Sequence, residues 1–213
     1  MASEAVRSID RIGLGVSQSL ADALNARFAD VPADAMLREL LAGEMHGRVS
    51  VVSSFGTESA VLLHMIAAAD PAAEIIFVDT LKMFPETLAY RDQLIALLGL
   101  TNVRVEQPDP DLLAKRDATD LRWSYDPDGC CDIRKVQPLA RALRDVEAWI
   151  SGRKGFQSKT RAALPVFEVE DGRLKINPLA RWSKGDLDAW FVRHDLPRHP
   201  LKAQGYLSIG CAP

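Results

Sequence analysis

The chain has 213 residues, of which 47% are hydrophobic and 26% charged, and its formal net charge is −3. This length and composition can bury the core of a globular domain without disulfide or metal cross-links. The slightly acidic balance argues against a nucleic-acid partner, and no apolar run reaches the about 20 residues of a membrane-spanning helix. The first ten residues lack the apolar core of a secretory signal, so we expect a cytoplasmic protein with no membrane partner.

Apolar residues recur at helical spacing in two N-terminal segments, 16–28 and 36–45. This spacing predicts two amphipathic helices that pack on the rest of the chain. Residues 1–15 have no such period and are expected to form a loosely ordered tail. We assign residues 1–47 to the helices and residues 48–213 to an α/β domain. The sequence shows no internal repeat or linker, which predicts a single domain overall.

From residue 49 onward, short apolar segments alternate with helical ones. Strands are expected at 49–52, 74–78 and 103–105, and helices at 58–69 and 85–98. Apolar strands joined by helices are typical of a parallel sheet that is covered on both faces. The sequence therefore predicts an α/β fold with a doubly wound, mainly parallel sheet.

The second half of the chain mixes further elements with polar segments. Capping, turn and alternation signals predict its elements. In chain order they are a polar loop over 109–129, a helix over 131–144, a strand at 149–150, a hairpin over 166–176, a helix over 184–194 and a loop from 196 onward.

The segment after the first expected strand has the residues of an anion-binding loop. It reads Ser53-Ser54-Phe55-Gly56-Thr57-Glu58-Ser59 and leads into a helix. Backbone N–H groups in such a loop attract an anion, and Gly56 allows close approach to the backbone. The alternative is an ordinary turn without a ligand. The segment is not a Walker loop, because it lacks the glycine and lysine spacing of that motif.

A second polar pair, Asp79-Thr80, follows the strand expected at 74–78. Doubly wound folds bind ligands at the carboxyl ends of their parallel strands, where this aspartate would lie. The alternative is that Asp79 only caps a helix or closes a turn.

The chain contains three cysteines, of which Cys130 and Cys131 are adjacent and Cys211 lies far away in the sequence. So few cysteines do not indicate a disulfide framework, and adjacent ones seldom bond to each other because the ring is strained. Two thiolates at the start of a helix are well placed for a metal cluster, since the helix N-terminus stabilises negative sulfur. The alternatives are thiols without a metal, or tetrahedral zinc held by the cysteines and His194 or His199.

Residues 151–161 are rich in lysine and arginine and contain no acid. A charge run of this kind is usually a solvated loop. Arginine and lysine also match the oxygens of sulfate and phosphate, so an anion site is the functional alternative.

Together these segments resemble the sulfonucleotide reductases, which comprise the adenosine 5′-phosphosulfate (APS) and 3′-phospho-APS (PAPS) reductases. The resemblance covers about three quarters of the chain and is carried by five segments. They are the loop at 53–65, Asp79-Thr80 with 84–87, the Cys-Cys-x-x-Arg-Lys-Val-x-Pro-Leu motif at 130–139, the basic residues 153–161, and Gly-Tyr-x-Ser-Ile-Gly-Cys at 205–211.

The resemblance implies the architecture of the adenine nucleotide alpha hydrolases, also called the PP-loop fold. It implies that the chain reduces APS to sulfite and AMP, with thioredoxin as the electron donor. The cations Arg134, Lys135, Arg153 and Arg161 would neutralise charge on the leaving phosphate. The substrate-binding residues that it implies are Ser53, Ser54, Phe55, Gly56, Thr57, Glu58, Ser59, Asp79, Thr80, Lys135, Arg153, Gln157 and Arg161.

For the cysteines, the resemblance implies a [4Fe–4S] cluster bound by Cys130, Cys131 and Cys211. Such a cluster normally has four thiolate ligands, and the family's fourth ligand and its nucleophilic cysteine match no residue of this sequence. We therefore expect a truncated chain, assign no catalytic residue, and expect no turnover of APS by this chain alone.

Several alternatives stay open at this point. A PAPS reductase would lack the paired cysteines, and an ATP-pyrophosphatase-like relative would have a different loop. A non-catalytic sulfonucleotide-binding module and a homo-oligomer also fit the sequence.

Overall fold

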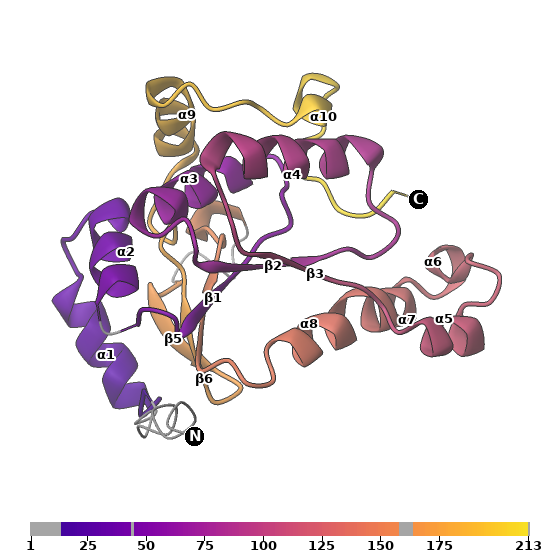
Figure 1. The fold of residues 1–213 in the computed structure, drawn as a ribbon, viewed down its shortest axis with the longest axis horizontal. Helices are drawn as coiled ribbons and strands as arrows, with labels where there is room; N and C mark the ends of the chain where they lie inside the picture. Colours follow the sequence, from indigo (N-terminus) through magenta and orange to yellow (C-terminus); the bar gives the residue numbers. More distant parts are fainter. Residues whose placement is uncertain (1–13, 44, 158–163, 213) are drawn as a thin grey trace, which may run out of the picture.

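The structure, a computed structural model, describes residues 14–43, 45–157 and 164–212, and the structural statements below refer to these residues (Figure 1). A six-stranded sheet with the order β3-β2-β1-β4-β6-β5 forms its centre. Every neighbouring pair of strands is parallel except the antiparallel pair of β5 and β6. The strands are β1 (Val49–Val52), β2 (Glu74–Val78), β3 (Val103–Glu106), β4 (Ala148–Ser151), β5 (Phe167–Glu170) and β6 (Arg173–Ile176).

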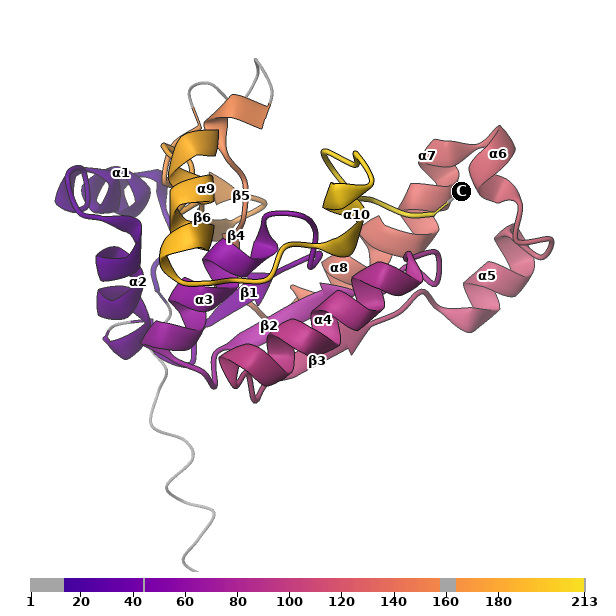
Figure 2. The same cartoon turned by 90° about the horizontal axis from the view of Figure 1, so that it is seen from above.

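Helices cover both faces of this sheet. In Figure 1, α3 and α4 lie on one face and α8 lies on the other, which confirms the doubly wound α/β fold. Figure 2 shows α5, α6 and α7 projecting from one end of the molecule. The helices are α1 (Gln18–Arg27), α2 (Ala33–Ala42), α3 (Ser59–Ala69), α4 (Pro85–Leu98), α5 (Pro110–Arg116), α6 (Arg122–Tyr125), α7 (Pro127–Cys131), the π-helix η1 (Asp132–Val136), α8 (Gln137–Ala142), the 3₁₀ helix η2 (Gly155–Gln157), α9 (Lys184–Arg193) and α10 (Pro200–Ala203).

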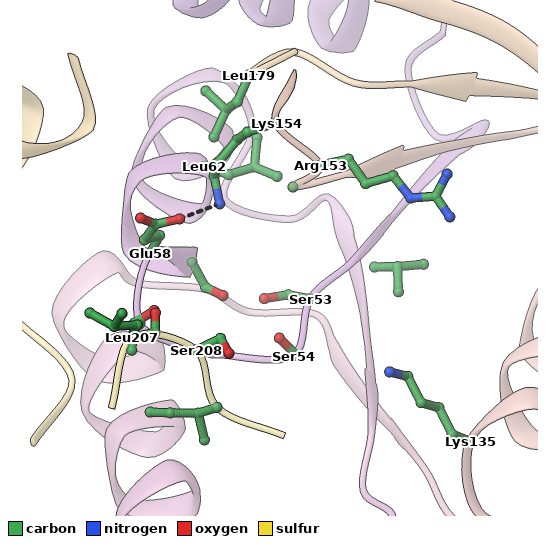
Figure 3. A pocket seen from close by; sticks show the side chains of 16 residues that line it. Ser53, Ser54, Glu58, Leu62, Lys135, Arg153, Lys154, Leu179, Leu207 and Ser208 are labelled. Atoms are coloured by element: carbon green, nitrogen blue, oxygen red, sulfur yellow. Dashed lines mark hydrogen bonds and ion pairs between the residues drawn. The ribbon is translucent and has the colours of Figure 1, made fainter. Parts of the chain in front are cut away.

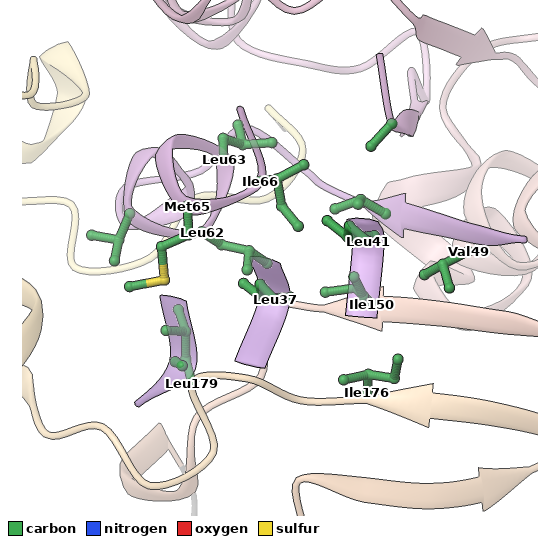
Figure 4. Packing of buried hydrophobic residues seen from close by; sticks show 14 of the residues in the cluster. Leu37, Leu41, Val49, Leu62, Leu63, Met65, Ile66, Ile150, Ile176 and Leu179 are labelled. Atoms are coloured by element: carbon green, nitrogen blue, oxygen red, sulfur yellow. The ribbon is translucent and has the colours of Figure 1, made fainter. Parts of the chain in front are cut away.

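The main hydrophobic core lies between the sheet and the helices α2 and α3. Leu37, Leu63, Ile150 and Ile176 are fully buried there (Figure 4). Burial of each such side chain contributes about 1.5–3 kcal/mol to folding. A smaller cluster on the opposite face joins α8 to the sheet through Ile76 and neighbouring residues.

Most of the expected elements are present near the expected positions. The hairpin at 166–176 corresponds to β5 and β6, and Ser183 begins α9 with a capping box to Asp186. Of the expected tail, residues 1–13 lie outside the described residues. Within the described ranges, no helix is both long and apolar enough to cross a bilayer.

The prediction of a loop over 109–129 is wrong, because α5, α6 and the start of α7 occupy it. Asp109 and Asp126 cap α5 and α7 through their side chains, and a proline follows each of them as the first helical residue. Aspartate followed by proline is a helix-start signal, since proline fixes φ where no N–H is needed. The expected loop from 196 onward likewise contains the short helix α10.

The strand order creates a crevice at one edge of the sheet. From β1 the chain proceeds to β2 on one side, whereas β4 pairs with β1 on the other side. Val52 is aligned with Ser151, so the loops after β1 and β4 start next to each other. In doubly wound folds, this point of reversal at the carboxyl edge is where ligands bind.

Candidate functional site

A cavity of about 360 Å³ lies at this carboxyl edge. Its walls come from the loop after β1, the loop after β4, the π-helix η1 and the C-terminal segment (Figure 3). The lining residues are Val52, Ser53, Ser54, Gly56, Thr57, Glu58, Ser59, Leu62, Lys135, Gly152, Arg153, Lys154, Leu179, Leu207, Ser208 and Ile209. The structure therefore brings together eight of the residues that the sequence predicts for substrate binding: Ser53, Ser54, Gly56, Thr57, Glu58, Ser59, Lys135 and Arg153.

Phe55 anchors the loop after β1 instead of lining the cavity. Its side chain is fully buried and packs edge-to-face on Phe77, with ring centroids 5.4 Å apart. Its φ of +50° lies in the left-handed region, which non-glycine residues seldom adopt. The N–H of Phe55 donates to the Ser53 hydroxyl at 3.2 Å. Core packing thus holds the turn, and the side chain of Phe55 is not available to a substrate.

Three cations and one carboxylate line the cavity. Lys154 and Glu58 form an ion pair of 2.8 Å whose side chains are 7% and 16% exposed. Arg153 is more exposed and lies 3.7 Å from Glu170. Lys135 extends from η1, and in Figure 3 its ammonium group points toward Ser54. The excess of positive charge suits an anionic ligand.

The C-terminal strap, which we define as residues 205–212, forms one wall of the cavity. The hydroxyl of Thr57 donates to the carbonyl oxygen of Leu207 at 3.3 Å. Near its end the strap is fixed by a β-bridge between Met83 and Cys211 and by a hydrogen bond from Ala212 N to Lys82 O at 2.6 Å. The strap brings Leu207, Ser208 and Ile209 to the loop after β1.

Asp79 and Thr80 do not line this cavity. Asp79 accepts hydrogen bonds from the amide of Leu81 at 2.9 Å and from the side chain of Gln107 at 3.1 Å. These contacts match the alternative in which Asp79 closes a turn. Thr80 is buried, and its hydroxyl lies 3.1 Å from the Cys211 sulfur. The side chain of Gln157 and all of Arg161 lie outside the described residues.

The cysteines are not disulfide-bonded. Cys130 is buried, and burial raises the pKa of its thiol. Arg134 lowers this pKa, whereas charges at Asp117, Cys131 and Cys211 raise it further, so the other two cysteines act electrostatically on Cys130. The expectation that the cysteine pair starts a helix is wrong, because α7 already begins at Pro127 and continues through η1 and α8. The helix N-terminus therefore lies one turn before the thiols.

Arg134 does not face the cavity, in contrast to its expected role as a cation for the leaving phosphate. Its guanidinium group is buried and donates to Asp117 at 2.7 Å, to Asp120 at 2.6 Å and to the Thr80 carbonyl at 3.0 Å. Burial alone would raise the pKa of Asp117, but the hydrogen bonds from Arg134 and from the Arg122 amide outweigh it and lower the pKa. Arg134 thus ties the cysteine-bearing helix to the loop after β2.

The zinc alternative is not supported. Within the described ranges, no three His, Cys, Asp or Glu side chains are gathered to hold a metal ion. The ring of His194 lies 4.3 Å from that of Trp190 and 4.4 Å from that of His64. Both ring nitrogens of His199 contact protein groups, at Thr87 and at the Leu201 amide.

A mainly parallel sheet with a cation-lined crevice at its point of reversal places the protein in the class of doubly wound α/β proteins. Residues 48–213 match the model of the phosphoadenosine phosphosulfate reductase domain. The chain therefore belongs to the phosphoadenosine phosphosulfate reductase family.

Individual relatives agree with this membership. An adenosine 5′-phosphosulfate reductase from Mesorhizobium japonicum is 52% identical over 79% of this chain, which spans 66% of that relative's length. A protein of the same name from Chelativorans sp. is 46% identical over 89% of this chain and 78% of its own. The crystal structure of a phosphoadenylyl-sulfate reductase from Candida auris in a phosphate complex superposes with a TM-score of 0.79 and 29% identity, and covers 93% of this chain and 97% of that one.

Proposed function

We propose that the chain binds APS in the carboxyl-edge cavity and acts in its reduction to sulfite and AMP. The observation that carries the proposal is that the serine-rich loop after β1 and three cations line one cavity. This cavity lies at the carboxyl edge of the sheet, where the strand order reverses. Two relatives at 52% and 46% identity are named APS reductases, which supports the choice of substrate. Because the chain spans only 66% of the first relative, the activity of the whole relative is part of the proposal.

The residues of the cavity suit the chemistry of this substrate. APS is a mixed anhydride, and attack of a thiolate at its sulfur breaks the bond between sulfur and the bridging oxygen. The electron pair of that bond goes to the leaving AMP phosphate. Lys135 and the loop amides would stabilise the negative charge that develops there. Lys154 lies in the wall nearest the loop, where its ammonium group forms an ion pair with Glu58.

The reaction needs two electrons from an external dithiol, for which we propose thioredoxin. Attack of the first thiolate leaves the sulfite group on that sulfur as an S-sulfocysteine. A thiolate of the dithiol then forms a mixed disulfide and releases sulfite, and the second thiol resolves it. We assign the first thiolate to no residue of this chain.

We further propose that Cys130, Cys131 and Cys211 are ligands of an iron–sulfur cluster. Thiolates are the preferred ligands of such clusters, and Thr80 contacts both segments, through its hydroxyl to Cys211 and through its carbonyl to Arg134. The donors thus fit in type, and Thr80 links the two segments that carry them. Among the described residues the three sulfurs are not gathered as a metal site, so the proposal rests on the donor type and on this link. When bound, the cluster would supply an electrostatic field next to the cavity. Iron analysis and the absorption spectrum of anaerobically purified protein test this, and absence of iron would contradict it.

Isothermal titration calorimetry of APS tests the binding proposal without requiring turnover. We expect binding at a 1:1 ratio that weakens with salt, because ion pairs at the open side of the cavity are screened. Lys135→Gln is expected to weaken binding about tenfold without lowering the melting temperature, since Lys135 is exposed. His46→Gln, at an exposed position on the opposite edge of the sheet, is the control. Equal affinities of Lys135→Gln and the wild-type protein would contradict the proposal.

The alternative substrate PAPS is tested in the same experiment. A relative from Gloeobacter violaceus that is 36% identical over 96% of this chain is named a phosphoadenosine 5′-phosphosulfate reductase. A competition experiment compares the affinities of the protein for APS and for PAPS. If PAPS binds more tightly, PAPS becomes the proposed substrate in place of APS.

A further inference from the structure

The strap is one wall of the cavity, and its far end is fixed at Lys82 and Met83. Its near end is attached to the chain that precedes it. It follows directly on α10, a helix of four residues. A helix this short is not stable alone, because nucleation is unfavourable and few hydrogen bonds form. Tyr206 connects the two, since its N–H donates to the carbonyl of Leu201 at 3.2 Å. The position of the near end of the strap therefore depends on what fixes the start of α10.

His199 fixes this start from within the protein. The residue is 1% exposed. Its Nδ1 accepts a hydrogen bond from the Leu201 amide at 3.2 Å and so caps α10. A neutral imidazole with an accepting Nδ1 carries its proton on Nε2. This Nε2 lies 3.1 Å from the hydroxyl of Thr87 on α4, to which it donates.

A second contact secures the same segment to α4. Tyr90 is 1% exposed, and its ring centroid lies 4.8 Å from that of His199 in an edge-to-face arrangement. The hydroxyl of Tyr90 donates to the carbonyl of Pro197 at 2.7 Å. Thr87 is fully buried, so an unmade hydrogen bond at this point is costly.

We propose that His199 is a positioning residue for the substrate cavity, because it ties α10 to Thr87 and thereby holds the strap against the loop after β1. This inference rests on the proposed function for its effect on APS binding. Its structural part, the anchoring of residues 205–212, does not depend on which ligand the cavity takes. His199 touches none of the lining residues through a hydrogen bond of its own among the described contacts, and so acts through the strap.

Four substitutions distinguish the hydrogen bond between His199 and Thr87 from the cap that His199 provides to α10. In His199→Asn, the shorter side chain still caps α10 as the Nδ1 atom does, but it does not reach Thr87. In His199→Gln, the longer amide places a donor near the position of Nε2 and keeps the tie. Thr87→Val removes the partner hydroxyl, whereas Thr87→Ser keeps it.

We expect His199→Asn and Thr87→Val to increase amide hydrogen exchange in residues 205–212 and to weaken APS binding, each by about tenfold. His199→Gln and Thr87→Ser are expected to restore most of both. Leu187→Ala is the control for general destabilisation, because Leu187 is 1% exposed in α9, away from the strap. It is expected to lower the melting temperature without a specific increase of exchange in the strap.

The proposal is overturned if His199→Asn and Thr87→Val leave exchange in the strap at the wild-type rate. It is also overturned if Leu187→Ala increases that exchange equally, since the effect would then be one of stability alone. Failure of the wild-type protein to bind APS would instead contradict the proposed function, and the exchange rates would still decide whether His199 anchors the strap.

Discussion

The two edges of the central sheet carry cavities of similar size but opposite character. The cavity at the carboxyl edge has a volume of about 360 Å³, and the one at the amino edge about 410 Å³. The first is lined by three cations and one carboxylate, together with serine and threonine hydroxyls. The second is lined by Asp70, Glu74, Asp145 and Glu147, with Arg48 and His46 as its basic residues.

This difference shows that charge and topology, more than volume, identify the site for an anion. A sulfonucleotide would meet an excess of carboxylates at the amino edge, which repel it. At the carboxyl edge it meets exposed loop backbone and lysine. The four predictions below test this contrast between the edges, in order of decreasing expected effect.

The largest effect is expected at the buried ion pair of the carboxyl edge. Lys154→Met removes the cation that Glu58 faces at 2.8 Å, in a setting where both side chains are mostly buried. Breaking such a pair costs about 3–5 kcal/mol of unfolding free energy. Urea unfolding of the variant and the wild-type protein measures this loss of unfolding free energy. The double variant Lys154→Met with Glu58→Gln is expected to recover much of the stability, and no recovery would show that the pair is not the cause.

Charge reversal at the two exposed cations is expected to have the next largest effect. Lys135→Glu combined with Arg153→Glu turns the wall of the cavity acidic, and we expect APS binding to weaken by about hundredfold. Stability should change little, because both side chains are at least partly exposed. His46→Glu at the amino edge is the matched control. A similar loss of affinity in this control would remove the distinction between the two edges.

The stability of the protein is expected to depend on pH through His199, which is buried, and His64, which is partly buried. Burial lowers the pKa of His64, helped by His194, and burial lowers the pKa of His199 against an opposing effect of Glu86. The unfolded chain then binds more protons below the ordinary value of 6.5, so stability falls as pH decreases from there toward the lowered pKa values. The slope is at most about 1.4 kcal/mol per pH unit for each histidine.

Urea unfolding over a series of pH values measures this slope. His64→Gln and His199→Gln should each flatten it, because an amide does not titrate. Over the same pH range, the affinity for APS is expected to fall because of His199 and not because of His64. The contacts of His199 with Thr87 and Leu201 fix the strap, which lines the cavity. An unchanged slope in both variants would contradict the assignment.

The smallest effect is expected from Gly56→Ala. An added Cβ would lie 3.3 Å from the Ser54 hydroxyl, so that this side chain must shift by a few tenths of an ångström. We expect about threefold weaker binding of APS, from a slightly narrower cavity. Gly185→Ala in α9, where the added Cβ makes an ordinary contact of 3.5 Å, is the control. Calorimetry would contradict the prediction if both variants bound equally.

Much of the fold follows from local patterns in the sequence. The strands β1 and β2 are short apolar runs that are easily recognised, and Ser183 marks the start of α9. The helices α5, α6 and α7 do not follow from apolar spacing, because their residues are mostly polar and have no apolar period. The signal that could have located two of them is the Asp-Pro pair at 109–110 and 126–127.

The site is less predictable, because it depends on contacts between distant segments. The order of residues predicts the loop after β1, but not that Lys154 forms an ion pair with Glu58 of that loop. Arg134 is part of the cysteine motif, and its sequence context predicts an anion as its partner. In the structure, its guanidinium group instead forms an ion pair with Asp117. The inclusion of Leu207 in the wall of the cavity depends on long-range contacts of the strap with Thr57 and with Lys82 and Met83.

The central claim is that the carboxyl edge holds the sulfonucleotide. The most direct measurement is the electron density of a crystal of this protein grown with APS. The account predicts density for the nucleotide between the loop at residues 53–59 and Lys135, with its phosphate within hydrogen-bond distance of the loop amides. Density for the nucleotide at the amino edge, beside Arg48 and Asp145, would contradict it.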